Sequence, residues 1–208
     1  MAADQRAIDV DPERAVPYVN LGNSLIELER LDDVAAALQM AVELRDDFAL
    51  AWHNLGQVLR QQGKLDQAIA ASKKAIQLRP ERWLPYRDLA SSLLLAGGRN
   101  AAEICSAAER AVELEPDDAM NHLVLGEAYR LARRKQEAIA AFRKARELHP
   151  DSHVVLLSLG KMLMAEKRWD EAEEALRKSI ELRPNSRYSR HKLGVLLYMN
   201  HRLEEACS

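Results

Sequence analysis

The sequence is poor in the residues that build disulfide-linked, metal-binding or membrane-spanning proteins. Only two cysteines occur among its 208 residues, and they have no metal-site spacing. No apolar run approaches the ~18 residues of a membrane helix, and the first residues lack the apolar stretch of a signal peptide. These absences favour a reducing compartment, so we expect a cytoplasmic location without membrane insertion.

An excess of charge of one sign is also lacking. Lys and Arg total 30 and Asp and Glu total 32, so the net charge is −2. A balanced chain has no general attraction for polyanions, so we expect no nucleic acid among the partners. One dense basic cluster, Arg130, Arg133, Arg134 and Lys135, offers a phosphate contact, but a solvated helix end explains it equally well.

Sequence motifs of catalysis are absent as well. The chain contains no GxxxxGK[ST], GxGxxG, HExxH or GxSxG segment. His149 and His153 are four residues apart, but Pro150 separates them, so they cannot share one helix face as a metal pair would. We therefore expect no enzymatic activity, no metal and no cofactor.

What the sequence does contain is an internal repeat. Leu-Gly pairs recur every 34 residues, except for one interval of 70 residues that encloses a Leu-Ala pair at 89–90. The pairs begin at Leu21, Leu55, Leu125, Leu159 and Leu193. Prolines recur in the same register at Pro12, Pro80, Pro116, Pro150 and Pro184, with Asp46 at the missing place. Two series in one register indicate a repeat architecture.

Each repeat has the pattern of two amphipathic helices. In the second repeat, one apolar stripe is formed by Trp52, Leu55, Gly56 and Leu59, and another by Ala68, Ala75 and Leu78. The segment QQGKLD separates the two stripes and predicts a turn. Pro80 ends the second helix, and Pro85 lies near the first turn of the next one, where its missing N–H costs little.

This pattern resembles the tetratricopeptide repeat, whose 34-residue signature is W-x2-L-G-x2-Y, A-x3-F-x2-A and P. The fourth repeat matches best, with His122 in place of the opening aromatic and Leu125, Gly126, Tyr129, Ala138, Phe142, Ala145 and Pro150 in register. The resemblance covers essentially the whole chain. It implies an all-α fold, a right-handed superhelical α-solenoid of helix–turn–helix repeats.

The repeat register divides a single predicted solenoid, 1–208, into consecutive segments. These are the end of a preceding repeat at 1–14, full repeats at 15–48, 49–82, 83–118, 119–152 and 153–186, and a partial repeat at 187–208. The third repeat has 36 residues, and Gly97-Gly98-Arg99-Asn100 predicts an enlarged turn in it. HRLEEACS predicts the start of another second helix. The chain thus reads as part of a longer array, or as one that self-associates end to end through uncapped terminal helices.

In this family, a stripe at positions 2, 5, 6, 9 and 13 of the first helix lines the concave groove where peptides bind. In the first three repeats the stripe consists of Val16, Val19, Asn20, Asn23, Leu50, His53, Asn54, Gln57, Leu84, Arg87, Asp88 and Ser91. In the last three it consists of Met120, Leu123, Val124, Glu127, Val154, Leu157, Ser158, Lys161, Tyr188, His191, Lys192 and Val195. The ligand-binding candidates are Asn20, Asn23, His53, Asn54, Gln57, Arg87, Asp88, Leu123, Val124, Glu127, Leu157 and Lys161.

The polar part of this stripe has its own resemblance. Asn20 and Asn54 share position 6 and Asp88 continues the row, which resembles the asparagine row in the repeat arm of protein O-GlcNAc transferases. Side-chain amides offer a donor and an acceptor to a peptide backbone. Polar residues chosen for solubility are the alternative. The apolar part suits an amphipathic helix, or else packs between repeats.

We therefore predict a protein–protein interaction scaffold that binds a partner peptide or helix in the concave groove. Two alternatives stay open. One is the substrate-recruiting arm of a larger enzyme, such as a glycosyltransferase or kinase, and the other is a self-associating structural module.

Overall fold

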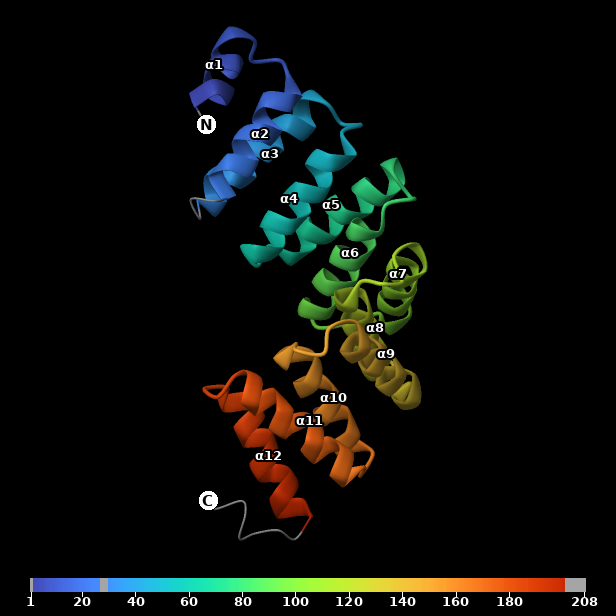
Figure 1. Ribbon diagram of the computed structural model, residues 1–208. Coiled ribbons are helices and arrows are strands. Elements are labelled where there is room, and N and C mark those ends of the chain that lie inside the picture. Colours follow the sequence, from blue (N-terminus) through green and yellow to red (C-terminus); the bar gives the residue numbers. More distant parts are fainter. Residues whose placement is uncertain (1, 27–29, 201–208) are drawn as a thin grey trace. The chain divides into compact units, whose positions relative to one another are not determined.

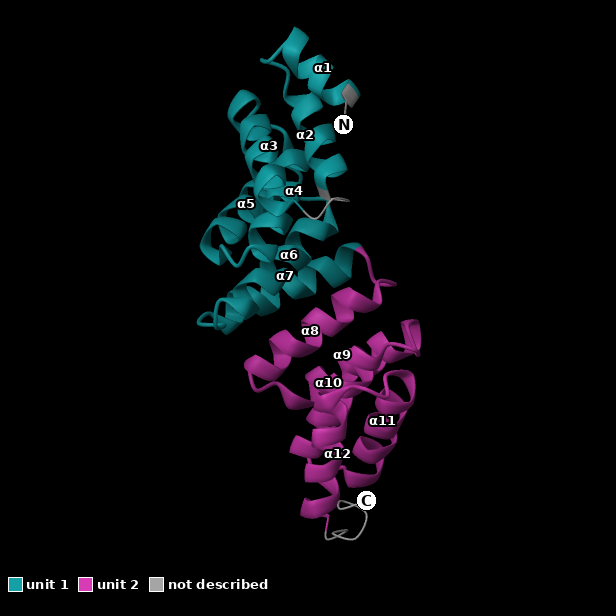
Figure 2. Cartoon of the chain, turned by 90° about the vertical axis from the view of Figure 1, so that its left-hand side faces the viewer, with its two compact units in different colours: residues 1–114 teal, residues 115–208 magenta. Residues whose placement is uncertain are grey.

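The computed structural model describes residues 2–26 and 30–200 (Figure 1). In these residues it contains twelve α-helices and no strand, which confirms the all-α class. The chain divides into two compact units, 1–114 and 115–208, and each is described by itself (Figure 2). The segment 201–208, where the sequence predicts another helix, lies outside the described residues.

The helices alternate between first and second members of antiparallel pairs. Unit 1 contains α1 (Ala2–Val10), α2 (Ala15–Ile26), α3 (Leu31–Leu44), α4 (Ala49–Gln61), α5 (Leu65–Leu78), α6 (Trp83–Leu95) and α7 (Ala101–Leu114). Unit 2 contains α8 (Ala119–Leu131), α9 (Lys135–Leu148), α10 (His153–Ala165), α11 (Trp169–Leu182) and α12 (Arg187–Met199). The first helices α2, α4, α6, α8, α10 and α12 begin at the first residue of each predicted repeat.

Packing within each unit follows the order of the helices. In unit 1, α1 packs on α2, α3 on α4 and α5 on α6, while α2–α3, α4–α5 and α6–α7 form the pairs. In unit 2, α8–α9 and α10–α11 form the pairs, α9 packs on α10 and α11 packs on α12. Each repeat therefore contacts its neighbours in sequence, as expected of a repeat protein.

The glycine that recurs in the first helices reflects close helix approach inside a pair. A Cβ atom added at Gly126 of α8 would lie 2.5 Å from Cε1 of Phe142 in α9. In the next pair, a Cβ at Gly160 would lie 2.8 Å from Cγ of Leu176. The small residue of the first helix thus makes room for the large residue of the second.

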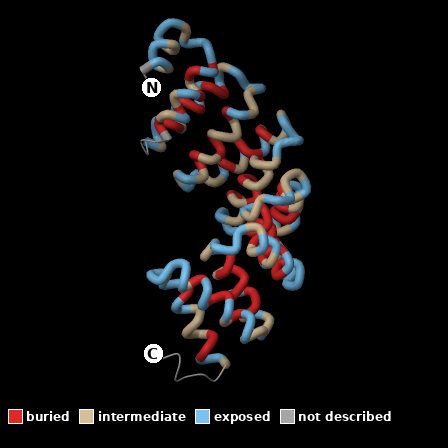
Figure 3. The backbone as a smooth tube through the Cα atoms, in the orientation of Figure 1, coloured by how far each residue is buried: buried red, intermediate tan, exposed pale blue. Residues whose placement is uncertain are grey.

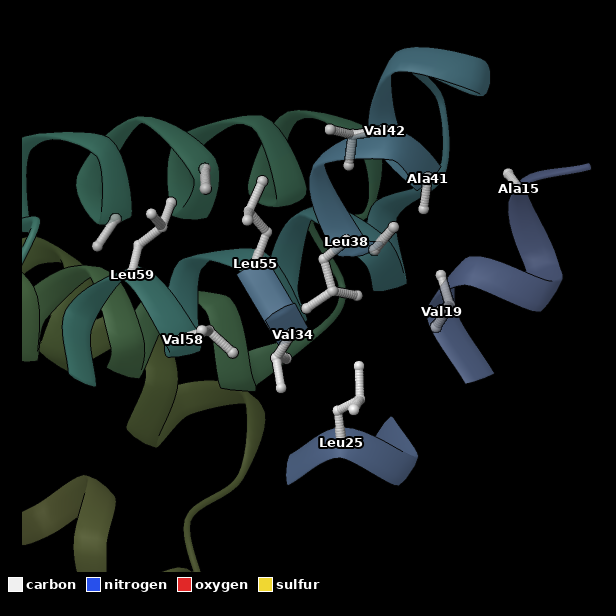
Figure 4. Packing of buried hydrophobic residues seen from close by; sticks show 13 residues of the cluster. Ala15, Val19, Leu25, Val34, Leu38, Ala41, Val42, Leu55, Val58 and Leu59 are labelled. Atoms are coloured by element: carbon white, nitrogen blue, oxygen red, sulfur yellow. The ribbon is translucent and has the colours of Figure 1, made fainter. Parts of the chain in front are cut away.

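Aliphatic side chains build most of both cores. In unit 1, residues such as Val34, Leu38 and Leu55 are almost fully buried and meet between α2, α3, α4 and α5 (Figure 4). In unit 2, Phe142 is fully buried beside Leu159 and Leu176. The buried positions recur along one side of the helices in each unit (Figure 3). A small aromatic content is enough, because Phe142 is the only aromatic side chain among the buried core residues described.

The opening aromatic of the signature and its replacement make equivalent hydrogen bonds. Trp52 Nε1 donates to the backbone oxygen of Asp46 at 2.8 Å. His122 Nε2 lies 2.7 Å from the backbone oxygen of Pro116, and both bonds reach back six residues. His122 therefore anchors the loop before α8 as Trp52 anchors the loop before α4.

The turns inside the pairs require a left-handed backbone at one position. Gly63 has φ +75° and Gly97 has φ +95°, while Arg133 and Lys167 adopt +60° and +58° at the equivalent place. Between α6 and α7, Gly98 adds a second positive φ of +63°. The two additional residues of the third repeat lie in this turn, so the predicted enlargement is confirmed.

Candidate functional site

Positions 2, 5, 6 and 9 of the first helices form the surface that we call the first-helix face. First helices of successive repeats touch one another, namely α4 with α6, α8 with α10 and α10 with α12. Positions 5 and 6 of these helices include buried residues, namely Asp88, Leu123, Val124 and Ser158, and Val19 at position 5 of α2 is buried as well. Position 2 lies farther out, and its side chains remain accessible.

The accessible side chains at position 2 are large and apolar. They are between 42% and 75% exposed in Val16, Leu50, Met120, Val154 and Tyr188, and Leu84 is half-buried. In unit 1 this row comes from α2, α4 and α6, and in unit 2 from α8, α10 and α12. These residues belong to the predicted stripe but are not among the predicted ligand-binding residues. The repeat pattern could have indicated them, because every repeat has a large apolar residue at position 2.

In unit 1, one member of the asparagine row, Asn54, bonds to the preceding repeat. Asn54 Nδ2 of α4 donates to Asn23 Oδ1 of α2 at 3.1 Å. Asn20 is exposed one turn away on α2, and Gln57 is half-buried on α4. The structure therefore brings Asn23 and Asn54 together and leaves the Asn20 amide accessible.

His53 and Asp88 are buried members of the first-helix face of unit 1 and lie next to each other. Their side chains are 11% and 4% exposed, and His53 Nδ1 lies 3.3 Å from Asp88 Oδ2. Arg60 Nη2 is 3.9 Å from Asp88 Oδ1 on the other side. The Asp88 carboxylate of α6 thus lies between the His53 imidazole and the Arg60 guanidinium, and both of these groups belong to α4.

Burial lowers the pKa of His53 below its ordinary value of 6.5. Asp88 opposes this effect by attraction, while the charges of Arg87 and Arg82 lower the pKa further. Arg87 itself lies with its guanidinium carbon 4.8 Å from the ring centre of Trp83, one turn earlier on α6. Desolvation dominates, so His53 favours the neutral form.

A cleft opens beside these residues in unit 1. It has a volume of about 730 Å³ and lies between the first turns of α4 and α6 and the loops that precede them. His53 and Asn54 line it together with Leu50 and Leu84. Two of the predicted ligand-binding residues therefore face a concave surface.

In unit 2, the same kind of polar contact joins α10 to α8. Ser158 Oγ donates to Glu127 Oε1 at 3.1 Å, and Arg130 Nε donates to Glu127 Oε2 at 2.7 Å. Both the Ser158–Glu127 and the Asn54–Asn23 bonds join position 6 of one repeat to position 9 of the preceding one, 31 residues away. Lys161, at position 9 of α10, is exposed.

The apolar candidates of unit 2 lie deeper than the polar ones. Leu123 and Val124 are each 8% exposed, and Leu123 belongs to the hydrophobic core cluster of this unit. Leu157 is half-buried and packs against that cluster. Leu157 is therefore the most accessible of the three.

Three family models described as tetratricopeptide repeat match the sequence, at residues 49–82, 87–153 and 131–192. Together they span the greater part of the chain. The chain belongs to the tetratricopeptide repeat family.

Solved tetratricopeptide structures have a similar fold. YrrB, described as a TPR protein with an unusual peptide-binding site, is 24% identical with a TM-score of 0.74, over 91% of this chain and 96% of YrrB. MamA from Desulfovibrio magneticus RS-1 is 21% identical with a TM-score of 0.73, over 83% of this chain and 97% of MamA. A chain of the APC/C hetero-tetramer Cut9–Hcn1 is 20% identical with a TM-score of 0.78, over 98% of this chain and 41% of that one. Comparison with curated proteins gave no significant match.

The tetratricopeptide fold is a scaffold for protein–protein interaction and is typically non-catalytic. Within residues 2–26 and 30–200, no group of three or more His, Cys, Asp and Glu side chains is placed to hold a metal ion. None of the helices described is long and apolar enough to span a membrane.

Proposed function

We propose that the chain binds an extended segment of a partner protein along the first-helix face of its tetratricopeptide repeats. The observation that carries the proposal is the row of exposed apolar side chains at position 2 in both units. Exposed apolar side chains that gather on one surface mark interaction sites, whereas scattered ones need no explanation. A row with one member in each repeat suits a ligand that runs from repeat to repeat.

The polar side chains beside this row supply hydrogen bonds to the ligand backbone. Asn54 uses one amide hydrogen on Asn23, which leaves it a second hydrogen and a carbonyl oxygen. Asn20 is exposed, and Gln57 offers the same chemistry. Asn20, Asn23, Asn54 and Gln57 therefore form the backbone-reading part of the proposed site in unit 1, next to His53, Arg87 and Asp88.

In unit 2 the proposed site is more apolar. Met120 and Val154 are exposed at position 2, Leu157 is half-buried at position 5, and Leu123 and Val124 are buried. Glu127 and Lys161 provide charges of opposite sign at position 9 of α8 and α10. A partner segment with apolar residues fits this part of the face, because their burial on binding contributes ~25 cal/mol per Å².

Similar proteins give the proposal a precedent. The YrrB structure is described as having a peptide-binding site, and the Cut9 structure as a hetero-tetramer with Hcn1. Both have the fold of this chain, although their identities of 24% and 20% carry nothing about its own partner.

The test is affinity capture of partner proteins with two matched variants. Leu50→Ser/Val154→Ser removes one exposed apolar contact from each unit, and both residues lie on the first-helix face. Met40→Ser/Leu182→Ser changes two exposed apolar residues on second helices, one in each unit, outside this face. We expect the first variant to lose the partners retained by wild type, and the second to keep them. Thermal unfolding checks that both fold.

An unchanged set of partners with Leu50→Ser/Val154→Ser would contradict the proposal. Asn54→Ala/Leu157→Ala is an independent test of partner binding, since it removes one polar and one apolar candidate residue. The recruiting arm of an enzyme, self-association and cytoplasmic location stay predictions of the sequence.

A further inference from the structure

The two units each carry a cleft at the same place in the repeat, but with different charge. The unit 1 cleft, of about 730 Å³, lies between the first turns of α4 and α6. The unit 2 cleft, of about 340 Å³, lies between the first turns of α8 and α10. Where the first has Arg79 and Arg82, the second has His149 and Ser152. The charged residues that line the unit 1 cleft can therefore be compared with those at the equivalent positions of the unit 2 cleft.

Three arginines surround the unit 1 cleft. Arg45 lies 3.8 Å from Asp47 and Arg79 lies 3.5 Å from Glu81, in pairs whose members are all at least 45% exposed. Exposed pairs of this kind contribute about 0–1 kcal/mol, so a ligand carboxylate competes with them easily. Arg82 is exposed and makes no ion pair with any residue that the structure describes. The cleft therefore has spare positive charge at its edge.

The inner wall of the cleft is apolar and its floor is closed. Leu50 and Leu84 line it from the first turns of α4 and α6, and Phe48 lies beneath the guanidinium carbon of Arg45, 3.5 Å from the ring centre. His53 forms part of the lining and holds Asp88 behind it. The buried carboxylate is thus shielded from the cleft, and it does not repel an acidic ligand group directly.

The beginning of α4 adds to the same preference. Its N-cap residue, Phe48, has no side-chain acceptor, whereas Asp118 and Ser152 accept hydrogen bonds from the first turns of α8 and α10. The free N–H groups of the first turn of α4 point out of the helix end, and the helix dipole is positive there. In unit 2, the N–H groups of Asn121 and Val155 already have side-chain acceptors.

We infer that the unit 1 cleft selects an Asp or Glu side chain of the bound partner segment, flanked by an apolar residue that packs on Leu50 and Leu84. Arg82 is the principal specificity residue, because its guanidinium is available and forms directional bonds to carboxylates. Arg79 and Arg45 assist it. The inference rests on the proposed function, since the acidic residue belongs to the segment that lies on the first-helix face.

The experiment uses the full chain and random-sequence phage-displayed peptides of about twelve residues. Selected peptides are synthesised, and their Kd values are measured by fluorescence anisotropy with wild type, Arg82→Glu and the matched control Lys64→Glu. Lys64 is exposed in the same unit, beyond the opposite end of α4. Both substitutions replace a positive by a negative side chain, so they change the net charge equally. Each peptide is also made with its acidic residue changed to the amide.

We expect the selected peptides to contain Asp or Glu next to an apolar residue. Arg82→Glu should weaken binding about tenfold or more, and the amide peptide should bind wild type about as weakly. Lys64→Glu should change Kd less than about threefold, and raising the salt from ~0.05 to ~0.5 M should reduce the effect of Arg82→Glu.

Three results would overturn the inference. Peptides without an acidic residue that lose binding with Leu50→Ser/Val154→Ser would leave the first-helix face as the binding site and remove the acidic selection. Peptides whose binding ignores both Arg82→Glu and Leu50→Ser/Val154→Ser would remove the proposed function as well. Equal losses with Arg82→Glu and Lys64→Glu would assign the effect to net charge rather than to the cleft.

Discussion

At the scale of single residues, the glycine of the signature matters most where a ring lies opposite. We expect Gly126→Ala to lower the free energy of unfolding by about 1–3 kcal/mol, because the new methyl group would lie 2.5 Å from the fully buried ring of Phe142. The measurement is urea denaturation followed by circular dichroism.

Gly56→Ala is the matched control. Its methyl group would lie 3.2 Å from Ser72 Oγ, which is a smaller group with room to adjust. The gain in helix propensity of up to about 1 kcal/mol offsets the remaining strain, so the stability should stay within about 1 kcal/mol of wild type. Equal losses in the two variants would show that the ring at position 142 is not what limits the substitution.

His53 should make the stability depend on pH. Its folded-state pKa lies below 6.5, so the unfolded chain binds a proton first as the pH falls. The stability is therefore full above the unfolded-state pKa and decreases below it, by at most about 1.4 kcal/mol per pH unit. His53→Gln should lose less stability than wild type between about pH 7.5 and about pH 5.5 in thermal unfolding. Identical pH profiles would mean that His53 is as well solvated in the fold as in the unfolded chain.

At the scale of helices, the two units begin their first helices differently. Ser152 accepts from the N–H of Val155 at 3.4 Å, so Ser152→Ala should destabilise the chain by about 0.5–1 kcal/mol. Arg82 occupies the same place before α6, with a similar extended backbone. Arg82→Ser should nevertheless give no equivalent gain, because Pro85 has no N–H to donate at the third position. Urea denaturation of both variants tests this, and a clear gain for Arg82→Ser would contradict it.

The helices were predictable because their signals are local. Pro80, Pro85 and the Leu-Gly pairs set the beginnings and ends of helices, and the described helices follow them closely. The site was less predictable. Helical periodicity places His53, Asp88 and Leu123 on one stripe, but only the contact between successive first helices decides that Asp88 and Leu123 are buried. The cleft is lined by residues of α4, α5 and α6 and of the segments that precede α4 and α6. Because these residues come together only in the folded chain, no local sequence pattern predicts the cleft.

At the scale of each unit, packing follows chain order, and protection from hydrogen exchange should follow it too. In unit 1, α1 packs against α2, whereas α4 packs against α3, α5 and α6. Local opening needs less free energy where fewer neighbours hold a helix. We expect the amides of α1 to exchange fastest and those of α4 to exchange among the slowest, as measured by mass spectrometry. Equal protection of α1 and α4 would mean that α1 is held by more than α2.

The Asn54–Asn23 and Ser158–Glu127 bonds have a practical consequence for redesign. In both, a side chain at position 6 donates a hydrogen bond to a side chain at position 9 of the preceding repeat. Grafting repeat 49–82 or repeat 153–186 in isolation would therefore separate the donor at position 6 from its acceptor in the preceding repeat. A graft that keeps two successive repeats together would preserve such a bond. Pairs of repeats are therefore the better unit for redesigning which partner is bound.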